Sequence, residues 1–267
     1  MSPHGGASSV PSTPPRETLD EAVARCRAAD LVHLLLDYDG TLVPLAPTPQ
    51  AAQPDAELIA LVERLGRSPR IDLHVVSGRT REDLAGWFGA CDASLWAEHG
   101  FWHRAPGGRL WRAVLTHPGA SLSAVAHVLE DFVARTPGSW VERKSASMAW
   151  HYRQAPPELG LRRARELRAA LAGSLERLGL DVLDGHKVVE VRRAGAGKAV
   201  VARALRKCDA QRHAILALGD DKTDDEMLAA LPAGAVTVSV GSTLPHARFR
   251  VATPREARHL IASLLHP

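Results

Sequence analysis

Three apolar runs of this sequence each end in polar residues that could take part in chemistry. These residues are Asp37 and Asp39 after the first run, Ser77 after the second, and Asp220, Asp221 and Asp224 after the third. Apolar runs of this kind are typical of buried parallel strands, whose carboxyl ends meet at one edge of a sheet, so we expect the three sets to lie together. A single aspartate after a strand is more often a turn residue or a helix cap, but the joint occurrence favours a site.

Carboxylates gathered in this way point to a metal-assisted reaction at phosphorus. Four or five of them in one place repel one another and lose hydration unless a hard cation offsets the cost, and oxygen ligands suit Mg²⁺. One carboxylate could then stay ionised and attack phosphorus, forming an aspartyl-phosphate. Asp37, at the end of its strand, is the candidate nucleophile, and Asp39 is the candidate general acid and base. Ser77 and Lys198 would supply donors around the transferring oxygens.

The surrounding pattern predicts the elements that must hold these residues. Strands are expected at 31–36, 71–76, 94–97, 214–218, 236–240 and 250–252, in alternation with helices that include 198–207 and 254–265. This alternation predicts an α/β architecture with a parallel, Rossmann-like sheet. From about residue 102 to 192 the pattern changes to short strands joined by short turns, with two helices between them, which favours an α+β insertion. The expected strands there are 109–115, 139–143, 146–152, 180–184 and 186–192.

We therefore expect one parallel core interrupted by a second domain. The core would comprise residues 17–104 and 193–267, and the inserted α+β cap would comprise 105–192. Residues 1–16 are rich in Pro, Ser and Gly, so they are predicted to form a disordered tail without a signal peptide.

Composition excludes several classes of function. The chain has 267 residues, is 45% hydrophobic and carries a formal charge of +3 with no basic stripe, so we expect no nucleic-acid partner. It lacks a run of about eighteen apolar residues, so we expect no membrane partner. Cys26, Cys91 and Cys208 lie far apart, without the paired spacings of zinc sites or disulfide frameworks. These features predict a cytoplasmic protein in a reducing compartment.

Four segments resemble the motifs of the haloacid dehalogenase (HAD)-type phosphatases. They are Asp37-Tyr38-Asp39-Gly40-Thr41-Leu42, Ser77-Gly78-Arg79, Lys198, and Gly219-Asp220-Asp221-Lys222-Thr223-Asp224. Within that superfamily the chain is similar to the trehalose-6-phosphate phosphatases from about residue 31 to its end. The third motif departs from the family pattern, because Lys198 sits between Gly197 and Ala199 where the family commonly has Asn and Gly.

The resemblance implies a reaction and a role for each matching residue. The reaction is Mg²⁺-dependent hydrolysis of trehalose-6-phosphate to trehalose and inorganic phosphate, with Asp37 as nucleophile, Asp39 as acid and base, and Ser77 and Lys198 holding the phosphoryl group. The implied metal residues are Asp37, Asp39 through its backbone carbonyl, Asp220, Asp221 and Asp224. The implied substrate-binding residues are Gly78, Arg79, Glu142, Lys144, His151, Arg153, Lys187 and Glu190, where either His186 or Lys187 would meet the sugar. The resemblance also implies functional coupling to a trehalose-6-phosphate synthase.

Other interpretations remain open at this point. The charged residues of the insert could be solvated faces of its strands, since alternation places some charge outward in any case. The substrate could be another phosphosugar, such as sucrose phosphate or a mannosylglycerate precursor. The chain could also be a sugar phosphomutase or a sensor without activity. An insert of about ninety residues favours hydrolysis over mutase chemistry, and the presence of both Asp37 and Asp39 argues against a sensor, which needs no proton donor. The six tryptophans are expected to pack in the core.

Overall fold

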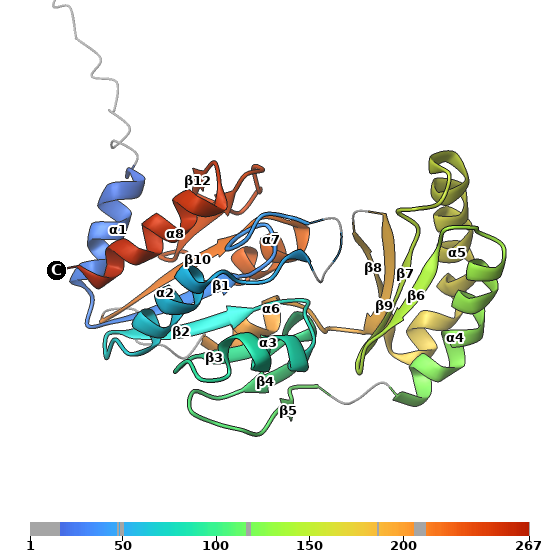
Figure 1. Cartoon of the computed structure of the whole chain (residues 1–267), viewed down its shortest axis with the longest axis horizontal. Helices are drawn as coiled ribbons and strands as arrows, with labels where there is room; N and C mark the ends of the chain where they lie inside the picture. Colours follow the sequence, from blue (N-terminus) through green and yellow to red (C-terminus); the bar gives the residue numbers. More distant parts are fainter. Residues whose placement is uncertain are drawn as a thin grey trace, which may run out of the picture.

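A computed structural model describes residues 17–46, 48, 51–115, 119–185, 187–205 and 212–266. Within these residues the chain forms an eight-stranded sheet and a separate four-stranded sheet, which lie side by side along the long axis of the molecule (Figure 1). The predicted tail, Cys208 and His186 lie outside the described residues. Among the described residues, no helix is both long enough and apolar enough to cross a membrane.

The larger sheet has the strand order β12-β11-β10-β1-β2-β3-β4-β5. Strands β12 to β3 in that order pair in parallel, and β3, β4 and β5 pair antiparallel at one edge. The bounds are β1 (Leu31–Asp37), β2 (Ile71–Val76), β3 (Ser94–Ala97), β4 (Trp102–Arg104), β5 (Arg112–Ala113), β10 (His213–Gly219), β11 (Val236–Val240) and β12 (Phe249–Val251). The mainly parallel sheet confirms the predicted α/β fold.

Helices cover both faces of the larger sheet. They are α1 (Leu19–Ala28), α2 (Ala56–Gly66), α3 (Arg81–Phe88), α6 (Ala199–Ala204), α7 (Lys222–Ala229) and α8 (Pro254–Ala262), with short 3-10 turns η2 (Glu98–Gly100) and η4 (Ser263–Leu265). Alternate residues of β1 serve the two sides: Leu34 and Leu36 pack with α1, α2, α3 and α8, whereas Leu35 packs with α6 and α7. Burial on both sides explains why the central strands are apolar almost without interruption.

The smaller sheet is antiparallel, in the order β6-β7-β9-β8. Its strands are β6 (Trp140–Arg143), β7 (Ser147–His151), β8 (Leu180–Gly185) and β9 (Val188–Arg193), and its helices are α4 (Gly119–Ala134) and α5 (Pro157–Leu178). Both helices lie on the side of this sheet that faces away from the larger one (Figure 1). Met148, Trp150, Val189 and Val191 pack against them. The opposite side, which we call the open face, is turned toward the larger sheet.

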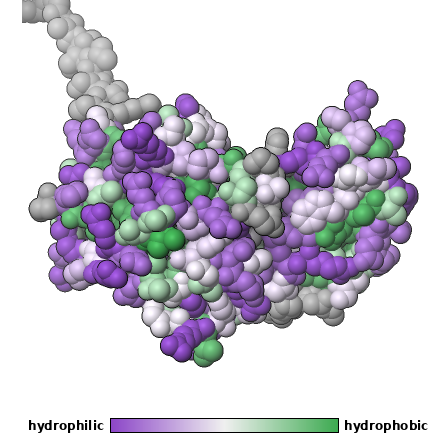
Figure 2. All heavy atoms as spheres, viewed as in Figure 1, coloured by the Kyte–Doolittle hydropathy of each residue, from purple (hydrophilic) through white to green (hydrophobic). Residues whose placement is uncertain are grey.

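One predicted strand pairs differently from the expectation. The sequence pattern predicts the segment 109–115 as a strand of the insert, but it contributes only β5, whose Ala113 pairs with Trp102 of β4 in the larger sheet. A short antiparallel extension of this kind terminates the edge of a parallel sheet. In the space-filling view, hydrophilic residues spread over both halves of the molecule, with smaller apolar groups between them (Figure 2).

Candidate active site

The polar ends of the central strands meet at one edge of the larger sheet. β1 lies between β10 and β2, and all three strands run in the same direction, so Asp37 at the end of β1 is flanked by the residues that follow the other two. One carboxylate oxygen from each of Asp37, Asp220 and Asp224 lies within 4.8 Å of the others. Asp37 and Asp224 are buried, and Asp220 is partly exposed. The structure thus brings together side chains that are up to 187 positions apart in the sequence (224 minus 37).

Lys198 provides the positive charge closest to this group. Its Nζ donates to Asp37 Oδ1 at 2.5 Å and to Asp224 Oδ1 at 2.7 Å. Burial alone would lower the pKa of Lys198, but the adjacent carboxylates of Asp224 and Asp37 outweigh burial and raise that pKa well above its ordinary value. The lysine therefore stays charged and holds two of the three carboxylates in place.

The single positive charge of Lys198 does not offset the burial and mutual repulsion of all three carboxylates. Burial raises the pKa of Asp37 to about 8, with Lys198 opposing the rise and Asp220 adding to it. Burial also raises the pKa of Asp220 to about 7, helped by repulsion from Asp224. The pKa of Asp224 lies well above its ordinary value, because burial and Asp37 disfavour its charge. Burial and mutual repulsion thus raise the pKa of all three carboxyl groups, and a further positive charge among them would oppose that rise.

Two glycines allow the carboxylates to approach the backbone. Gly40 has a φ of +82°, and a Cβ there would lie 2.1 Å from Asp220 Oδ2. A Cβ at Gly219 would lie 2.2 Å from the Cβ of Asp224. A side chain at Gly219 would thus require a shift of Asp224 at its Cβ, and one at Gly40 would require a shift of the Asp220 carboxylate in addition to an unfavourable φ.

The side chains of Asp221 and Asp39 accept hydrogen bonds from residues outside this group. Asp221 caps α7, where its Oδ1 accepts hydrogen bonds from the Thr223 amide at 2.8 Å and hydroxyl at 2.7 Å. Burial opposes ionisation of Asp221, but Lys198 and Thr223 hold its pKa well below the ordinary value. Asp39 accepts from Arg79 Nε at 2.7 Å and Nη2 at 2.5 Å. Of the five aspartates predicted to bind metal, the structure gathers the side chains of Asp37, Asp220 and Asp224 and places those of Asp39 and Asp221 in other contacts.

The second-motif loop, residues 77–79, follows β2 beside this group. Ser77 is fully buried, and its Oγ accepts from the Arg79 amide at 3.1 Å. The carbonyl of Gly78 accepts from Lys144 Nζ at 3.1 Å, so a residue predicted to bind substrate in the insert reaches the loop directly. A Cβ at Gly78 would lie 2.6 Å from the ring of His99, which packs over the loop.

Three predicted insert residues lie at or near the open face. Glu142 of β6 and Glu190 of β9 stand in one row across the sheet, both paired with Ala149 of β7. Glu190 is 6% exposed and lies 4.0 Å from Lys144 Nζ and 3.5 Å from His99 Nε2. Burial opposes its ionisation, yet Lys144 and His99 hold the pKa of Glu190 well below its ordinary value. The structure therefore places Lys144 on the second-motif loop, Glu190 beside Lys144, and Glu142 in the same row of the sheet as Glu190.

The other insert candidates lie toward the far end of the sheet. His151 is bonded to Glu142 Oε2 through Nε2 at 2.9 Å, so it remains on the open face. Arg153 is exposed two residues beyond the end of β7. Lys187, in the turn between β8 and β9, has a φ of +58°, and its carbonyl accepts from the Tyr152 amide at 3.0 Å. Arg153 and Lys187 thus lie at the end of the sheet opposite to Lys144.

The prediction that all six tryptophans pack in the core is wrong for Trp140. It is 44% exposed, and its indole stacks on the ring of His151 with centroids 4.2 Å apart and an interplanar angle of 11°. Its position two residues before Glu142 places it on the open face. That spacing was the available signal, because alternate residues of a strand share a face. Trp96 and Trp150 are buried as expected.

Within the described residues, several buried polar atoms near the carboxylates and the open face lack a hydrogen-bond partner. They include Asp37 Oδ2, His99 Nδ1 and Glu190 Oε1. An unsatisfied buried polar atom costs about 1 to 3 kcal/mol, so proteins seldom retain such atoms without a reason. A ligand that enters between the two sheets would find acceptors and a ring nitrogen already desolvated.

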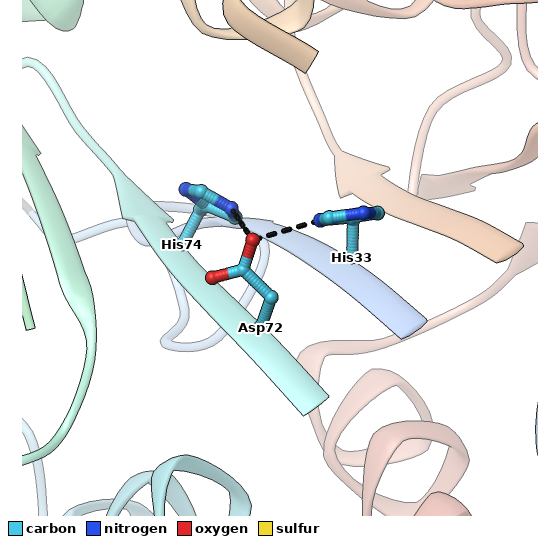
Figure 3. Close-up of side chains that lie close together, drawn as sticks. All are labelled: His33, Asp72 and His74. Carbon is cyan, nitrogen blue, oxygen red and sulfur yellow. Dashed lines mark hydrogen bonds and ion pairs between the residues drawn. The ribbon is translucent and has the colours of Figure 1, made fainter. Parts of the chain in front are cut away.

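A second polar cluster lies within β1 and β2 (Figure 3). Asp72 Oδ2 accepts from His33 Nδ1 at 2.8 Å and from His74 Nε2 at 3.0 Å. Trp96 Nε1 lies 3.2 Å from His74 Nδ1, and because indole can only donate, that nitrogen carries no proton. A metal ion bound through His74 Nε2 would move the proton to Nδ1, against the indole N–H. The hydrogen bonds of this cluster therefore compete with metal binding.

Comparison with known proteins assigns the family. The sequence profile of the trehalose-phosphatases matches residues 35–250. The chain belongs to the trehalose-phosphatase family. It is 42% identical over 88% of its length to the bifunctional trehalose-6-phosphate synthase/phosphatase of Thermoproteus tenax, and 33% identical over 72% of its length to the trehalose-phosphatase of Saccharomyces cerevisiae. It spans 32% and 24% of those two relatives, respectively.

Solved structures of trehalose-phosphatases share the fold. The C-terminal domain of the C. albicans trehalose-6-phosphate phosphatase matches with a TM-score of 0.81 and 25% identity, and the Aspergillus fumigatus trehalose-6-phosphate phosphatase matches with a TM-score of 0.71 and 32% identity. Each match covers 93% of this chain and 97% of the other. A haloacid dehalogenase-like hydrolase from Bacteroides thetaiotaomicron, 14% identical with a TM-score of 0.61, shares the fold alone. The predicted family and the HAD-like α/β fold are both confirmed.

Proposed function

We propose that this trehalose-phosphatase hydrolyses trehalose-6-phosphate to trehalose and inorganic phosphate. The observation that carries the proposal is the placing of three buried or partly buried carboxylates and Lys198 beneath an open face that bears Glu142 and Glu190. The first group has the chemistry for phosphoryl transfer, and the second has the acceptors that sugar hydroxyls require. The names of the relatives in the same family support trehalose-6-phosphate as the ester.

We propose that Mg²⁺ binds between Asp37, Asp220 and Asp224, with the backbone carbonyl of Asp39 as a further ligand. The donor set fits, because it consists of oxygens and includes Asp37 Oδ2, which is buried without a hydrogen-bond partner among the described residues. Burial and repulsion from Asp220 raise the pKa of Asp37, and a cation placed among these carboxylates would oppose both effects, which supports the proposal. When bound, Mg²⁺ would neutralise these carboxylates and polarise the phosphoryl oxygens.

The residues of the chain account for the proposed steps. An oxygen of Asp37 bonds to phosphorus as the bond from phosphorus to the sugar oxygen breaks, and protonated Asp39 gives its proton to that oxygen. Asp39 then takes a proton from water, whose oxygen attacks phosphorus and releases phosphate from Asp37. Lys198 and Ser77 hold the phosphoryl oxygens. Because both oxygens of Asp39 accept from Arg79, Asp39 must turn away from Arg79 to reach the leaving oxygen.

We propose that residues 105–192, apart from the β5 segment that pairs with the larger sheet, act as a cap on a core of residues 17–104 and 193–267. In this arrangement Glu142, Lys144 and Glu190 would read the sugar hydroxyls, while Gly78 and Arg79 line the phosphate side. The remaining candidates would lie at the outer end of the open face: His151, Arg153 and Lys187. Closure of such a cap would exclude water from the ester before the chemical step.

We also propose a metabolic and cellular setting. One relative in this family is named a bifunctional trehalose-6-phosphate synthase/phosphatase, which supports a supply of substrate from a trehalose-6-phosphate synthase. Cys26 and Cys91 are buried free cysteines, which supports the cytoplasm as the compartment.

A panel of phosphosugars tests the function directly. Phosphate release would be measured with trehalose-6-phosphate, sucrose phosphate and a mannosylglycerate precursor at equal concentration, with Mg²⁺ and with chelator. We expect preference for trehalose-6-phosphate by more than about tenfold, and loss of activity with chelator. Asp37→Asn should abolish turnover without unfolding the chain. Preference for a different ester, or turnover by Asp37→Asn, would contradict the proposal.

A further inference from the structure

The turn after β3 has an unusual backbone for its residue types. Glu98 and His99 have φ angles of +48° and +57°, a conformation that costs a residue other than glycine about 1 kcal/mol or more. Both backbone amides point to the second-motif loop: Glu98 donates to the Arg79 carbonyl and His99 donates to the Ser77 carbonyl, each at 2.9 Å. The strained turn is therefore attached to the loop that we propose holds the phosphoryl group.

The side chain of Glu98 points the other way, to the β6–β7 turn, residues 144–147. Its Oε1 accepts from Ser145 Oγ at 2.6 Å and its Oε2 accepts from the Ala146 amide at 2.8 Å. Trp102 Nε1 donates to Ser145 Oγ at 2.6 Å, so the hydroxyl proton is free to be given to Glu98. Glu98 is only 5% exposed, and both of its carboxylate oxygens are used.

The same turn carries Lys144. The Lys144 amide donates to the Ser147 carbonyl at 2.9 Å, which closes the turn, and its Nζ reaches the Gly78 carbonyl. His99, beside Glu98, packs against Gly78 and lies 3.5 Å from Glu190. Two adjacent residues thus bind the second-motif loop through their backbones and the open face through their side chains.

We infer that Glu98 is a positioning residue that sets the β6–β7 turn, and with it Lys144, over the second-motif loop when a phosphosugar is bound. The inference rests on the proposed function, because it assigns Glu98 to the orientation of that sugar. A change at Glu98 would therefore impair esters large enough to contact the open face. Esters too small to reach it would be affected much less.

The test compares two substrates in Glu98→Gln. Glutamine keeps the shape but removes the negative charge and one of the two acceptors, so only one of Ser145 Oγ and the Ala146 amide could still donate to it. We expect kcat/KM for trehalose-6-phosphate to fall by about 10- to 100-fold, mainly through KM, and kcat/KM for p-nitrophenyl phosphate to change less than about threefold. Glu57→Gln, an exposed glutamate of α2, is the matched control and should behave as wild type for both substrates.

Ser145→Ala tests the same role of Glu98 from the partner side. It can be used even if Glu98→Gln does not fold. It removes the hydroxyl donor and should show the same dependence on substrate size, with a smaller loss. The double variant should lose less than the product of the two single losses, because both disrupt one interaction. Equal losses on both substrates, or no loss on the sugar ester, would overturn the inference. If the wild type prefers another sugar ester in the panel, the proposed function fails and the same comparison on that ester still decides the role of Glu98.

Discussion

Replacing Gly40 with alanine tests whether the first motif must touch the acidic group through its backbone. The substitution adds a Cβ that would lie 2.1 Å from Asp220 Oδ2, whereas ordinary contacts begin at about 3.4 Å. The Asp220 carboxylate must therefore move by about 1 Å or more. If Asp220 is a metal ligand as proposed, a displacement of that size should cost about 100-fold in rate, and the φ of +82° adds about 1 to 2 kcal/mol of strain.

The assay separates these two effects. Gly107 has a φ of +62° with no atom within 4 Å of an added Cβ, so Gly107→Ala carries the backbone strain without the contact. We expect both variants to lose about 1 to 2 kcal/mol of unfolding free energy in urea. Only Gly40→Ala should lose about 100-fold in kcat and need more Mg²⁺ for half-maximal activity. The reasoning fails if Gly40→Ala keeps activity within twofold of wild type, or if Gly107→Ala loses as much activity.

Two further substitutions probe the charged groups. Lys198→Met should lower the rate of phosphate release in a single turnover by about 100- to 1,000-fold, because it removes the cation bonded to Asp37 and Asp224; a loss below tenfold would contradict this role. In the second cluster, hydrogen bonds from His33 and His74 hold the pKa of Asp72 well below its ordinary value. Ionised Asp72 therefore stabilises the folded protein above about pH 4, and this contribution is lost as the pH falls below that. Asp72→Asn should therefore cost about 1 kcal/mol in urea unfolding at pH 7, after allowance for the partial exposure of Asp72, and less at pH 3; an equal difference at both pH values would refute the assignment.

The sequence predicts the strands better than the contacts between them. β2 and β11 have the predicted bounds, because each is an apolar run with clear limits, and the period of two in β6 and β9 places Glu142 and Glu190 on one face. These are local properties that a strand expresses wherever it lies. The grouping of Asp37 with Asp220 also follows, since parallel neighbours end at the same edge.

Partner choice between distant segments could not be derived in this way. Asp39 is bonded to Arg79, 40 positions away, and Glu98 to Ser145, 47 positions away. Such pairs depend on the path of the whole chain. The strand β5 joined the larger sheet for the same reason, since a two-residue strand has no pattern that indicates its neighbour. Trp140 was misassigned because aromatic residues usually pack inside, and only its place beside Glu142 distinguishes it.

The two sides of the smaller sheet divide two tasks between alternate residues. Val189 and Val191 pack against the helices, and Glu190 between them lies on the open face beside Lys144 and His99. A substitution on the open face can change what that face contacts. The residues that pack against α4 and α5, and hence folding, stay the same. Evolution can therefore change the residues of the open face at little cost in stability. The reason is that adjacent residues of one strand lie on different faces, so one can be substituted while the other keeps its packing.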